Sequence, residues 1–212
     1  MYLPNAFNED RLEVRHGLMR AHPLATLIVT GADGVSADLI PFMLYAEEGP
    51  NGLGLLRAHV ARANPLWRKL EASASCLVVF QGPEAYISPG WYETKRTTHK
   101  VVPTWNYTMV QARGQARVVD DAAWLRRQLD DLTLSQEGGL PAPWQPSDAP
   151  ADFLAATMKG IIGIEIPIDT LVGKWKVSQN RSAEDQHGVV EGLQSQQASQ
   201  MAGLVAERIT KD

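Results

Sequence analysis

The sequence of 212 residues contains a single cysteine, Cys76, so the chain cannot form an internal disulfide. Because Cys76 lies in the apolar run CLVVF, we expect a small core residue in a protein kept under reducing conditions. No apolar run approaches the ~20 residues of a membrane-spanning helix, and the N-terminus lacks the pattern of a secretory signal. These absences predict a cytoplasmic protein that does not enter a membrane.

The sequence also lacks the short motifs of common hydrolases, nucleotide-binding proteins and zinc sites. It has no G-x-S-x-G, G-x-x-x-x-G-K-[ST], G-x-G-x-x-G or H-E-x-x-H motif and no paired cysteines. Its five histidines are scattered, and a lone histidine is more often structural than catalytic. We therefore assign no catalytic residue and no metal ligand, and any reaction would depend on a cofactor.

Acidic residues are missing from three segments of the chain. Residues 49–70, 94–119 and 170–183 contain no Asp or Glu, yet they hold 12 of the 20 Lys and Arg residues, in a chain of net charge -4. Strands are generally poor in Asp and Glu, but that tendency does not explain the bases. A nucleic-acid-binding face needs a broad basic stripe, so the pattern favours a local site for an anion.

Alternating and β-branched apolar segments predict an antiparallel sheet. Strands are expected at 24–30, 35–45, 53–60, 75–81 (followed by a turn at 82–83 and an extension at 85–88), 101–119 (interrupted by Pro103), 161–168 and 171–177. Helical patterns cover 120–137 and 151–160, a short helix follows residue 64, and 89–100 is expected to be a loop. The predicted fold is mainly β with flanking helices (α+β), a closed or nearly closed antiparallel barrel, in one domain of residues 1–212. Roughly residues 182–212 form a polar C-terminal tail, helical or disordered.

Two stretches place polar and aromatic residues where a cofactor could bind. RAHVARANPLW puts His59 and Arg62 at a strand-to-helix junction whose free amides suit a phosphate, although a capped helix with an exposed arginine fits equally well. KVVPTWNY puts Thr104, Trp105, Asn106 and Tyr107 in a row, which fits either a binding edge or an aromatic plug at a barrel end.

A third stretch, GKWKVSQNR at 173–181, contains three cations and no acid. Strand alternation would put Trp175, Gln179 and Arg181 on one face, where an aromatic ring, an amide and a guanidinium suit a flat acidic ligand. Lys174 and Lys176 would lie on the opposite face. The alternative is a solvated edge strand whose lysines prevent aggregation.

Five ordered motifs, HVARANPLW, FQGPEAYISPGWY, KVVPTWNYTMV, PADF and GKWKVSQNR, closely resemble the PaiB-like family of FMN-binding negative transcriptional regulators. The likeness runs from MYLP to about GVVEGL, nearly the whole chain. It implies a split β-barrel of the FMN-binding type and a homodimer that holds FMN at its interface. It further implies a flavin-dependent regulator or sensor. The alternatives are a flavin-dependent oxidoreductase and, with less support, a haem-binding or haem-degrading protein.

The resemblance also implies which residues surround FMN. By this resemblance, the residues near the phosphate would be His59, Arg62 and Asn64. The residues near the ribityl chain or ring would be Thr104, Trp105 and Asn106. The site would be closed by Lys174, Trp175, Gln179 and Arg181, and the set is completed by Ser88, Trp91 and Lys100. Two positions depart from the family pattern, where Gly90 replaces a serine and Leu39 replaces a histidine. The family label leaves direct DNA binding open, but the sequence has no helix-turn-helix signature to support it.

Overall fold

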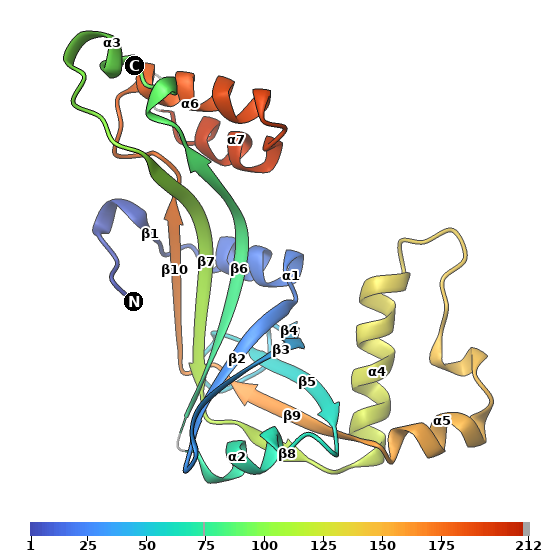
Figure 1. The fold of residues 1–212 in the computed structure, drawn as a ribbon. Coiled ribbons are helices and arrows are strands. Elements are labelled where there is room, and N and C mark those ends of the chain that lie inside the picture. Colours follow the sequence, from blue (N-terminus) through green and yellow to red (C-terminus); the bar gives the residue numbers. More distant parts are fainter. Residues whose placement is uncertain (74, 210–212) are drawn as a thin grey trace. The chain divides into compact units, whose positions relative to one another are not determined.

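The computed structural model describes residues 1–73 and 75–209. The chain separates into two compact units, each assembled from distant segments (Figure 1). The first unit comprises Met1–Leu18, Gln81–Val110 and Val172–Asp212, and the second comprises Met19–Phe80 and Gln111–Leu171. Some strands run from one unit into the other. The single domain expected from the sequence therefore stays a prediction.

Ten strands occur among the described residues: β1 Asn8–Glu9, β2 Leu24–Gly31, β3 Gly34–Pro41, β4 Met43–Tyr45, β5 Leu55–Ala61, β6 Cys76–Ile87, β7 Thr104–Gly114, β8 Arg117–Val119, β9 Ile161–Pro167 and β10 Thr170–Lys176. Within the first unit the strand order is β1-β10-β7-β6. Within the second unit β6, β2 and β3 are neighbours, and β4-β5-β9-β8 form a separate sheet. The pairs β2–β3, β2–β6, β5–β9 and β8–β9 are all antiparallel, as the sequence predicts.

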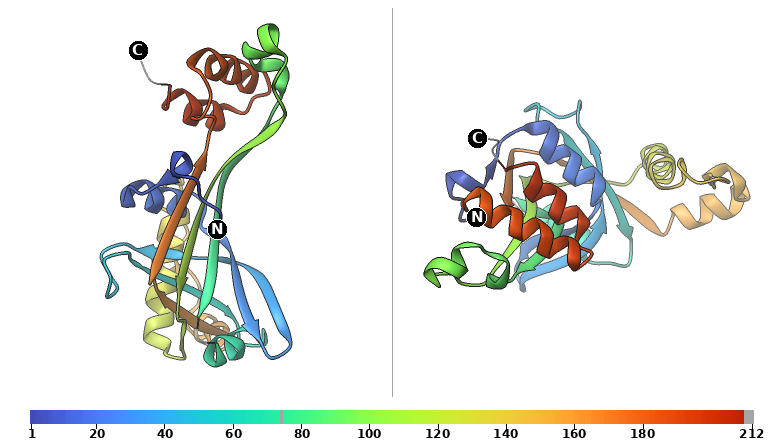
Figure 2. Two further views of the ribbon diagram at one scale, coloured as in Figure 1. Left: turned by 90° about the vertical axis from the view of Figure 1, so that its left-hand side faces the viewer. Right: turned by 90° about the horizontal axis from the view of Figure 1, so that it is seen from above.

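Seven α-helices occur in the same part of the chain: α1 Leu12–Ala21, α2 Leu66–Ala72, α3 Thr94–Thr98, α4 Ala122–Glu137, α5 Ala151–Met158, α6 Ala183–Ser195 and α7 Ser199–Ala206. Asp121 begins α4 by accepting a hydrogen bond from the Trp124 amide at 2.6 Å. Ser182 caps α6 in the same way, through the Asp185 amide at 3.3 Å. The C-terminal tail therefore continues as α6 and α7, which lie side by side (Figure 2).

The core of the second unit is formed by alternating side chains of its strands. Phe42 and Phe80 meet edge-on, with ring centroids 6.3 Å apart. Along β5 and β9, the buried cross-strand pairs are Leu56–Ile166, Ala58–Ile164 and Val60–Ile162. Every second residue of each strand thus faces the core.

A charged row lies on the other face of this four-stranded sheet. Glu165 of β9 is directly opposite Arg57 of β5 and Arg117 of β8. Its carboxylate accepts hydrogen bonds from both guanidinium groups, at 2.9 and 2.5 Å, and from Trp124 Nε1 at 3.2 Å. Because Glu165 is 9% exposed, these donors compensate its lost hydration and link three strands to α4.

Three predictions about strands are wrong. The strand expected at 35–45 is divided between β3 and β4, which belong to different sheets. Strand β6 continues through Gly82 and Pro83, where a turn was expected, because this glycine serves a close contact: an added Cβ would lie 2.3 Å from Thr108 Oγ1. The residues of β6 that pair with β2 are Cys76–Val79. Pro83 lies outside this range, so its lack of a backbone N–H does not disturb the pairing. The strand expected at 101–119 begins only at residue 104 and is interrupted after residue 114.

The segment 89–100, predicted as a loop, contains a short 3-10 helix and α3. Asp185 of α6 accepts hydrogen bonds from the amide and hydroxyl of Thr94, at 2.8 and 2.9 Å. Trp91 packs closely against Gly188 and Gly192 of α6. A Cβ atom added to Gly188 would lie 2.0 Å from the Trp91 carbonyl oxygen, and one added to Gly192 would lie 2.2 Å from the Trp91 ring. Contacts from α6 that are distant in sequence thus order this segment.

Candidate functional site

Three cations of the first unit, Lys174, Lys176 and Arg181, form no ion pair with any residue that the structure describes. Lys176 Nζ donates hydrogen bonds to Thr104 Oγ1 and, at 2.7 Å, to the Trp105 carbonyl. Lys174 Nζ donates to another backbone carbonyl at 3.1 Å. Because these acceptors are all neutral, the positive charge of the cluster is left for an anion.

These three cations also influence one another. Burial lowers the pKa of Lys176 from its ordinary value, and the charges of Lys174 and Arg181 lower it further. An anion beside Lys176 would stabilise its protonated form and so oppose both effects. The electrostatics of the cluster therefore favour an anionic ligand.

Aromatic side chains accompany the two lysines on the same face of the first unit. Trp105 is 53% exposed and meets Tyr86 edge-on, with ring centroids 5.9 Å apart. The ring centroid of Tyr107 lies 5.2 Å from Lys174 Nζ and 6.0 Å from Lys176 Nζ. Exposed aromatic rings beside unpaired cations can hold a flat heteroaromatic ring with an acidic substituent.

A tight turn after β10 fixes Arg181 beside this face. Ser178 has a left-handed backbone with φ of 65°, and its buried hydroxyl accepts a hydrogen bond from Asn106 Nδ2 at 2.9 Å. Gln186 Nε2 of α6 donates to the carbonyls of Ser178 and Arg181, at 3.0 and 3.2 Å. The Arg181 guanidinium lies 4.6 Å from the centroid of the Tyr92 ring. The turn is thus held in place from two elements.

The predicted alternation of residues 173–181 is wrong in its second half. Strand β10 ends at Lys176, and the left-handed Ser178 breaks the two-residue period. Trp175 is buried in the core, and Gln179 folds back so that its Nε2 donates to the Trp175 carbonyl at 2.5 Å. Trp175 and Gln179 therefore do not form an open ligand face with Arg181.

Ser88, Trp91 and Lys100 lie between β6 and β7. Ser88 Oγ accepts a hydrogen bond from the Gly90 amide at 3.1 Å and so caps the 3-10 helix. Trp91 is committed to its contact with α6. Lys100 is exposed, and its Nζ makes no hydrogen bond or ion pair with the described residues. Contact of Ser88 and Trp91 with a ligand stays a prediction, and Lys100 is exposed and available to one.

Arg62, predicted to contact the phosphate, already has partners in the second unit. Its guanidinium forms two hydrogen bonds with the Asp120 carboxylate, at 2.6 and 2.8 Å. It also donates to the carbonyls of Lys159 and Ile161, at 3.0 and 3.1 Å. A phosphate at Arg62 would have to compete with a carboxylate for the same donors.

His59 and Asn64 also have structural partners. His59 Nδ1 lies 2.7 Å from Oε1 of the buried Gln128. Asn64 Oδ1 accepts a hydrogen bond from the Leu66 amide at 2.9 Å, and its Nδ2 donates to Asp38 at 3.5 Å. An amide that was expected to be free for phosphate is therefore capped by a side chain. Contact of these residues with a phosphate stays a prediction.

Tyr107, named in the row of residues 104–107, shares a face of β7 with Trp105, as strand alternation requires. Sequence reasoning missed Tyr86, which meets Trp105 from β6, a neighbouring strand. Among residues 1–73 and 75–209, no cluster of His, Cys, Asp or Glu is suited to a metal ion. No helix in the described part of the chain is long and apolar enough to cross a membrane.

Comparisons with known proteins agree with a flavin site. Residues 1–170 match the family described as "Putative FMN-binding domain". An uncharacterized protein of Emericella nidulans is 36% identical over 228 residues, covering 92% of this chain and 91% of its own. The protease synthase and sporulation protein PAI 2 of Bacillus subtilis is 30% identical over 214 residues, covering 100% and 99%. The solved FAD- and haem-binding protein of Mycobacterium smegmatis matches with a TM-score of 0.56 at 21% identity, over 79% of this chain and 71% of its own.

The chain therefore belongs to this family of FMN-binding domains. The resemblance to the PaiB-like family is confirmed, and FMN is the cofactor of the family. The predicted fold class, α+β with an antiparallel split barrel, is also confirmed.

Proposed function

We propose that the protein holds FMN against the aromatic and cationic face of the first unit and acts as a flavin-dependent regulator or sensor. The observation that carries this proposal is the cluster of Lys174, Lys176 and Arg181, which has neutral partners and adjoins the exposed Trp105. An FMN phosphate carries close to two negative charges at neutral pH, so it supplies the charge that this cluster lacks.

The residues divide between the two parts of such a ligand. Lys176, Arg181 and the exposed Lys100 are the candidates for the phosphate, whereas Trp105 and Tyr86 offer flat apolar surface to the ring. Thr104 Oγ1 accepts a hydrogen bond from Lys176 Nζ, which holds that ammonium group in place. When bound, FMN would supply one- and two-electron redox chemistry that none of these side chains can perform.

Titration of the apoprotein with FMN and with riboflavin tests the proposal. The two ligands share the ring system and differ by the phosphate, so riboflavin should bind at least tenfold more weakly. The absorbance spectrum of the purified protein separates bound flavin from the haem alternative. Equal affinity for FMN and riboflavin would mean that the cations do not bind the phosphate.

The proposal includes a second copy of the chain, with FMN at the interface of a homodimer. One face of β2 and β3 pairs Leu24, Thr26, Ile28 and Thr30 with Pro41, Leu39, Ala37 and Val35. Leu77 and Val79 of β6 extend this face beside Ile28 and Thr26. None of these ten side chains is charged, and Leu24, Val35 and Leu39 are 59%, 71% and 67% exposed.

The size of this apolar face supports a protein partner. Two strands of eight residues and the four paired residues of β6, with strands about 4.8 Å apart and rising about 3.4 Å per residue, span roughly 330 Å² in projection. That is about two fifths of the ~800 Å² that each partner buries in a standard interface. Exposed Leu39, which departs from the family pattern, is explained as part of this contact.

Replacing Leu39 with glutamate tests the dimer. Sedimentation should give twice the 23.3 kDa chain mass for the parent protein and a monomer for Leu39→Glu. Leu134→Glu is the matched control, because Leu134 is 71% exposed on α4, outside this face. If the Leu39→Glu monomer keeps its FMN affinity, the interface location is wrong and the cation cluster is still supported.

One observation favours the alternative of a flavin-dependent oxidoreductase. Catalysed hydride transfer usually needs a group that exchanges a proton near the flavin, and the lowered pKa makes Lys176 a candidate. Apart from the lysines, the face consists of tryptophan, threonine and tyrosine side chains, which are not the usual proton-exchanging groups of enzymes. We therefore favour a sensor, whose flavin occupancy or redox state is read by a partner.

Anaerobic stopped-flow mixing with NADH or NADPH separates the two functions. A sensor should show slow flavin reduction and weak turnover. Flavin bleaching at tens per second, an ordinary rate for an enzyme step, would make the protein an oxidoreductase.

A further inference from the structure

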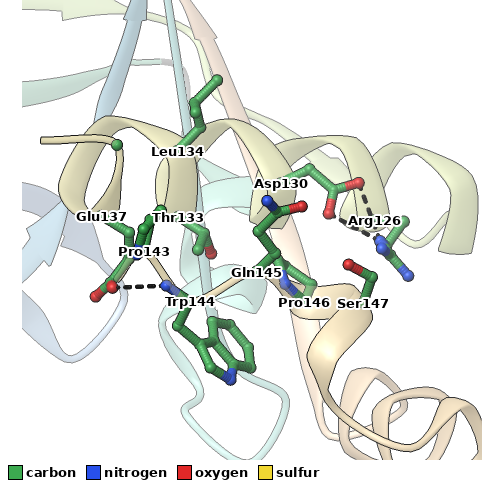
Figure 3. Close-up of a pocket in the computed structure, with 11 residues that line it drawn as sticks. Arg126, Asp130, Thr133, Leu134, Glu137, Pro143, Trp144, Gln145, Pro146 and Ser147 are labelled. Atoms are coloured by element: carbon green, nitrogen blue, oxygen red, sulfur yellow. Dashed lines mark hydrogen bonds and ion pairs between the residues drawn. The ribbon is translucent and has the colours of Figure 1, made fainter. Parts of the chain in front are cut away.

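A pocket in the second unit lies between α4 and the connector that follows it (Figure 3). Its volume is about 440 Å³, within the range of small-molecule sites. One wall is the last part of α4, with Thr133, Leu134 and Glu137, and the other is residues 143–147 of the connector. The connector is held by Pro146, which is buried, and by the Gln145 amide, which donates to Asp148 Oδ2 at 2.8 Å.

The charged side chains of the pocket leave one negative charge without a partner. Arg126 and Asp130 neutralise each other, with Arg126 Nε 2.9 and 3.0 Å from the two carboxylate oxygens. Glu137 is half-buried and accepts a hydrogen bond from the Trp144 amide at 3.0 Å, but it forms no ion pair with the described residues. The charge of this carboxylate is therefore available to a cationic ligand.

Two further features of the pocket attract positive charge. Glu137 is the last residue of α4, so it lies at the negative end of the helix dipole. The indole of Trp144 is 47% exposed beside the pocket, and an aromatic face binds cations through its quadrupole. Helix end, carboxylate and indole all select the same sign of charge.

We propose that this pocket binds an organic ammonium ion, with the charged nitrogen at Glu137 and its alkyl groups against Trp144. A bare metal ion does not fit, because the pocket supplies one unpaired carboxylate and Trp144 offers no metal ligand. An anion is disfavoured by the helix end and by Glu137. This site belongs to α4 and its connector, and it stands independently of the proposed flavin site.

Choline and its neutral isostere 3,3-dimethylbutan-1-ol are suitable probes, since they share their shape and differ in charge. Each is titrated into the full-length, ¹⁵N-labelled protein while the indole N–H signal of Trp144 is followed, identified by its loss in Trp144→Phe. Choline should shift this signal with a Kd on the order of 1 mM, as expected for one ion pair and one cation–π contact. The neutral alcohol should bind at least tenfold more weakly.

Substitutions at Glu137 separate charge from folding. Glu137→Gln keeps an acceptor for the Trp144 amide and removes the charge, so choline should bind at least fivefold more weakly. Glu137→Asp keeps the charge and should retain more affinity than Glu137→Gln. Glu191→Gln is the matched control, because it removes an exposed acid from α6, and it should change the affinity less than twofold.

Three results would each overturn the proposal. They are equal binding of the alcohol and choline, equal losses in Glu137→Gln and Glu137→Asp, and no shift of the Trp144 signal up to 50 mM choline, about fifty times the expected Kd of roughly 1 mM.

Discussion

Replacing Lys176 with methionine tests whether the cation cluster holds the FMN phosphate. Methionine keeps an unbranched apolar side chain and removes the ammonium group. The variant loses the hydrogen bonds from Nζ to Thr104 Oγ1 and to the Trp105 carbonyl. It also loses the repulsion by Lys174 and Arg181 that lowers the Lys176 pKa. Because these two losses oppose each other, the stability of the apoprotein should change by less than about 1 kcal/mol.

The effect on FMN binding should be larger than the effect on folding. A hydrogen bond to a charged group contributes about 1.5 to 3 kcal/mol, which corresponds to a roughly 10- to 150-fold weaker affinity for FMN. Riboflavin lacks the phosphate, so its affinity should change less than threefold. Arg62→Ala provides a comparison, because that guanidinium is already paired with Asp120, and it should lower FMN affinity less than Lys176→Met does.

Fluorescence titration of the flavin measures both affinities, and urea denaturation of the apoproteins measures stability. Lys176→Met should lose affinity for FMN alone. An equal loss for FMN and riboflavin would place Lys176 beside the ring and not the phosphate. If Arg62→Ala has the larger effect, FMN displaces Asp120, and the phosphate binds where the sequence motif predicts.

Three further predictions follow from burial and charge. Glu165→Gln should lower the free energy of unfolding by about 1.5 to 3 kcal/mol at pH 7. Although burial raises its pKa, the bonds from its arginine and tryptophan partners lower it overall, so this stability should be complete above pH ~4.3 and lost as pH falls further. Gly192→Ala should destabilise by about 1 to 3 kcal/mol through collision with Trp91, whereas Gly203→Ala, with open space around it, should not; thermal unfolding compares them. FMN affinity should fall as pH rises through the lowered pKa of Lys176, below its ordinary value of about 10.4, with riboflavin as the control titration.

The fold was predictable where local pattern and tertiary environment agree. Strands β2, β5, β9 and β10 and helix α4 lie close to their predicted positions, because each has a strong apolar period. The turn expected at Gly82 is absent, because this glycine is required for close contact with Thr108, 26 residues away in sequence. Helix α1 was missed, and α3 depends on hydrogen bonds that Thr94 donates to Asp185, which no local pattern can reveal.

The site was predictable in composition but not in arrangement. The stretch 173–181 does supply unpaired cations, as its lack of acids indicates. Its alternation could not be extended past residue 176, because a single left-handed residue, Ser178, ends the strand period. This conformation depends on Asn106 and Gln186, which approach from β7 and α6.

Two of the acid-free segments, 49–70 and 170–183, differ in a way that only the fold reveals. In 49–70, Arg57, Arg62 and Lys69 each form an ion pair with a carboxylate from another part of the second unit. Their charge is therefore used in holding that unit together, and a ligand anion would have to replace a bonded carboxylate. In 170–183 none of the residues that the structure describes supplies such a carboxylate, and burial together with Lys174 and Arg181 lowers the pKa of Lys176. The distinction between a structural cation and a ligand-binding one thus lies in whether folding has already brought it a counter-charge, which is why Lys176→Met and Arg62→Ala should have unequal effects on FMN.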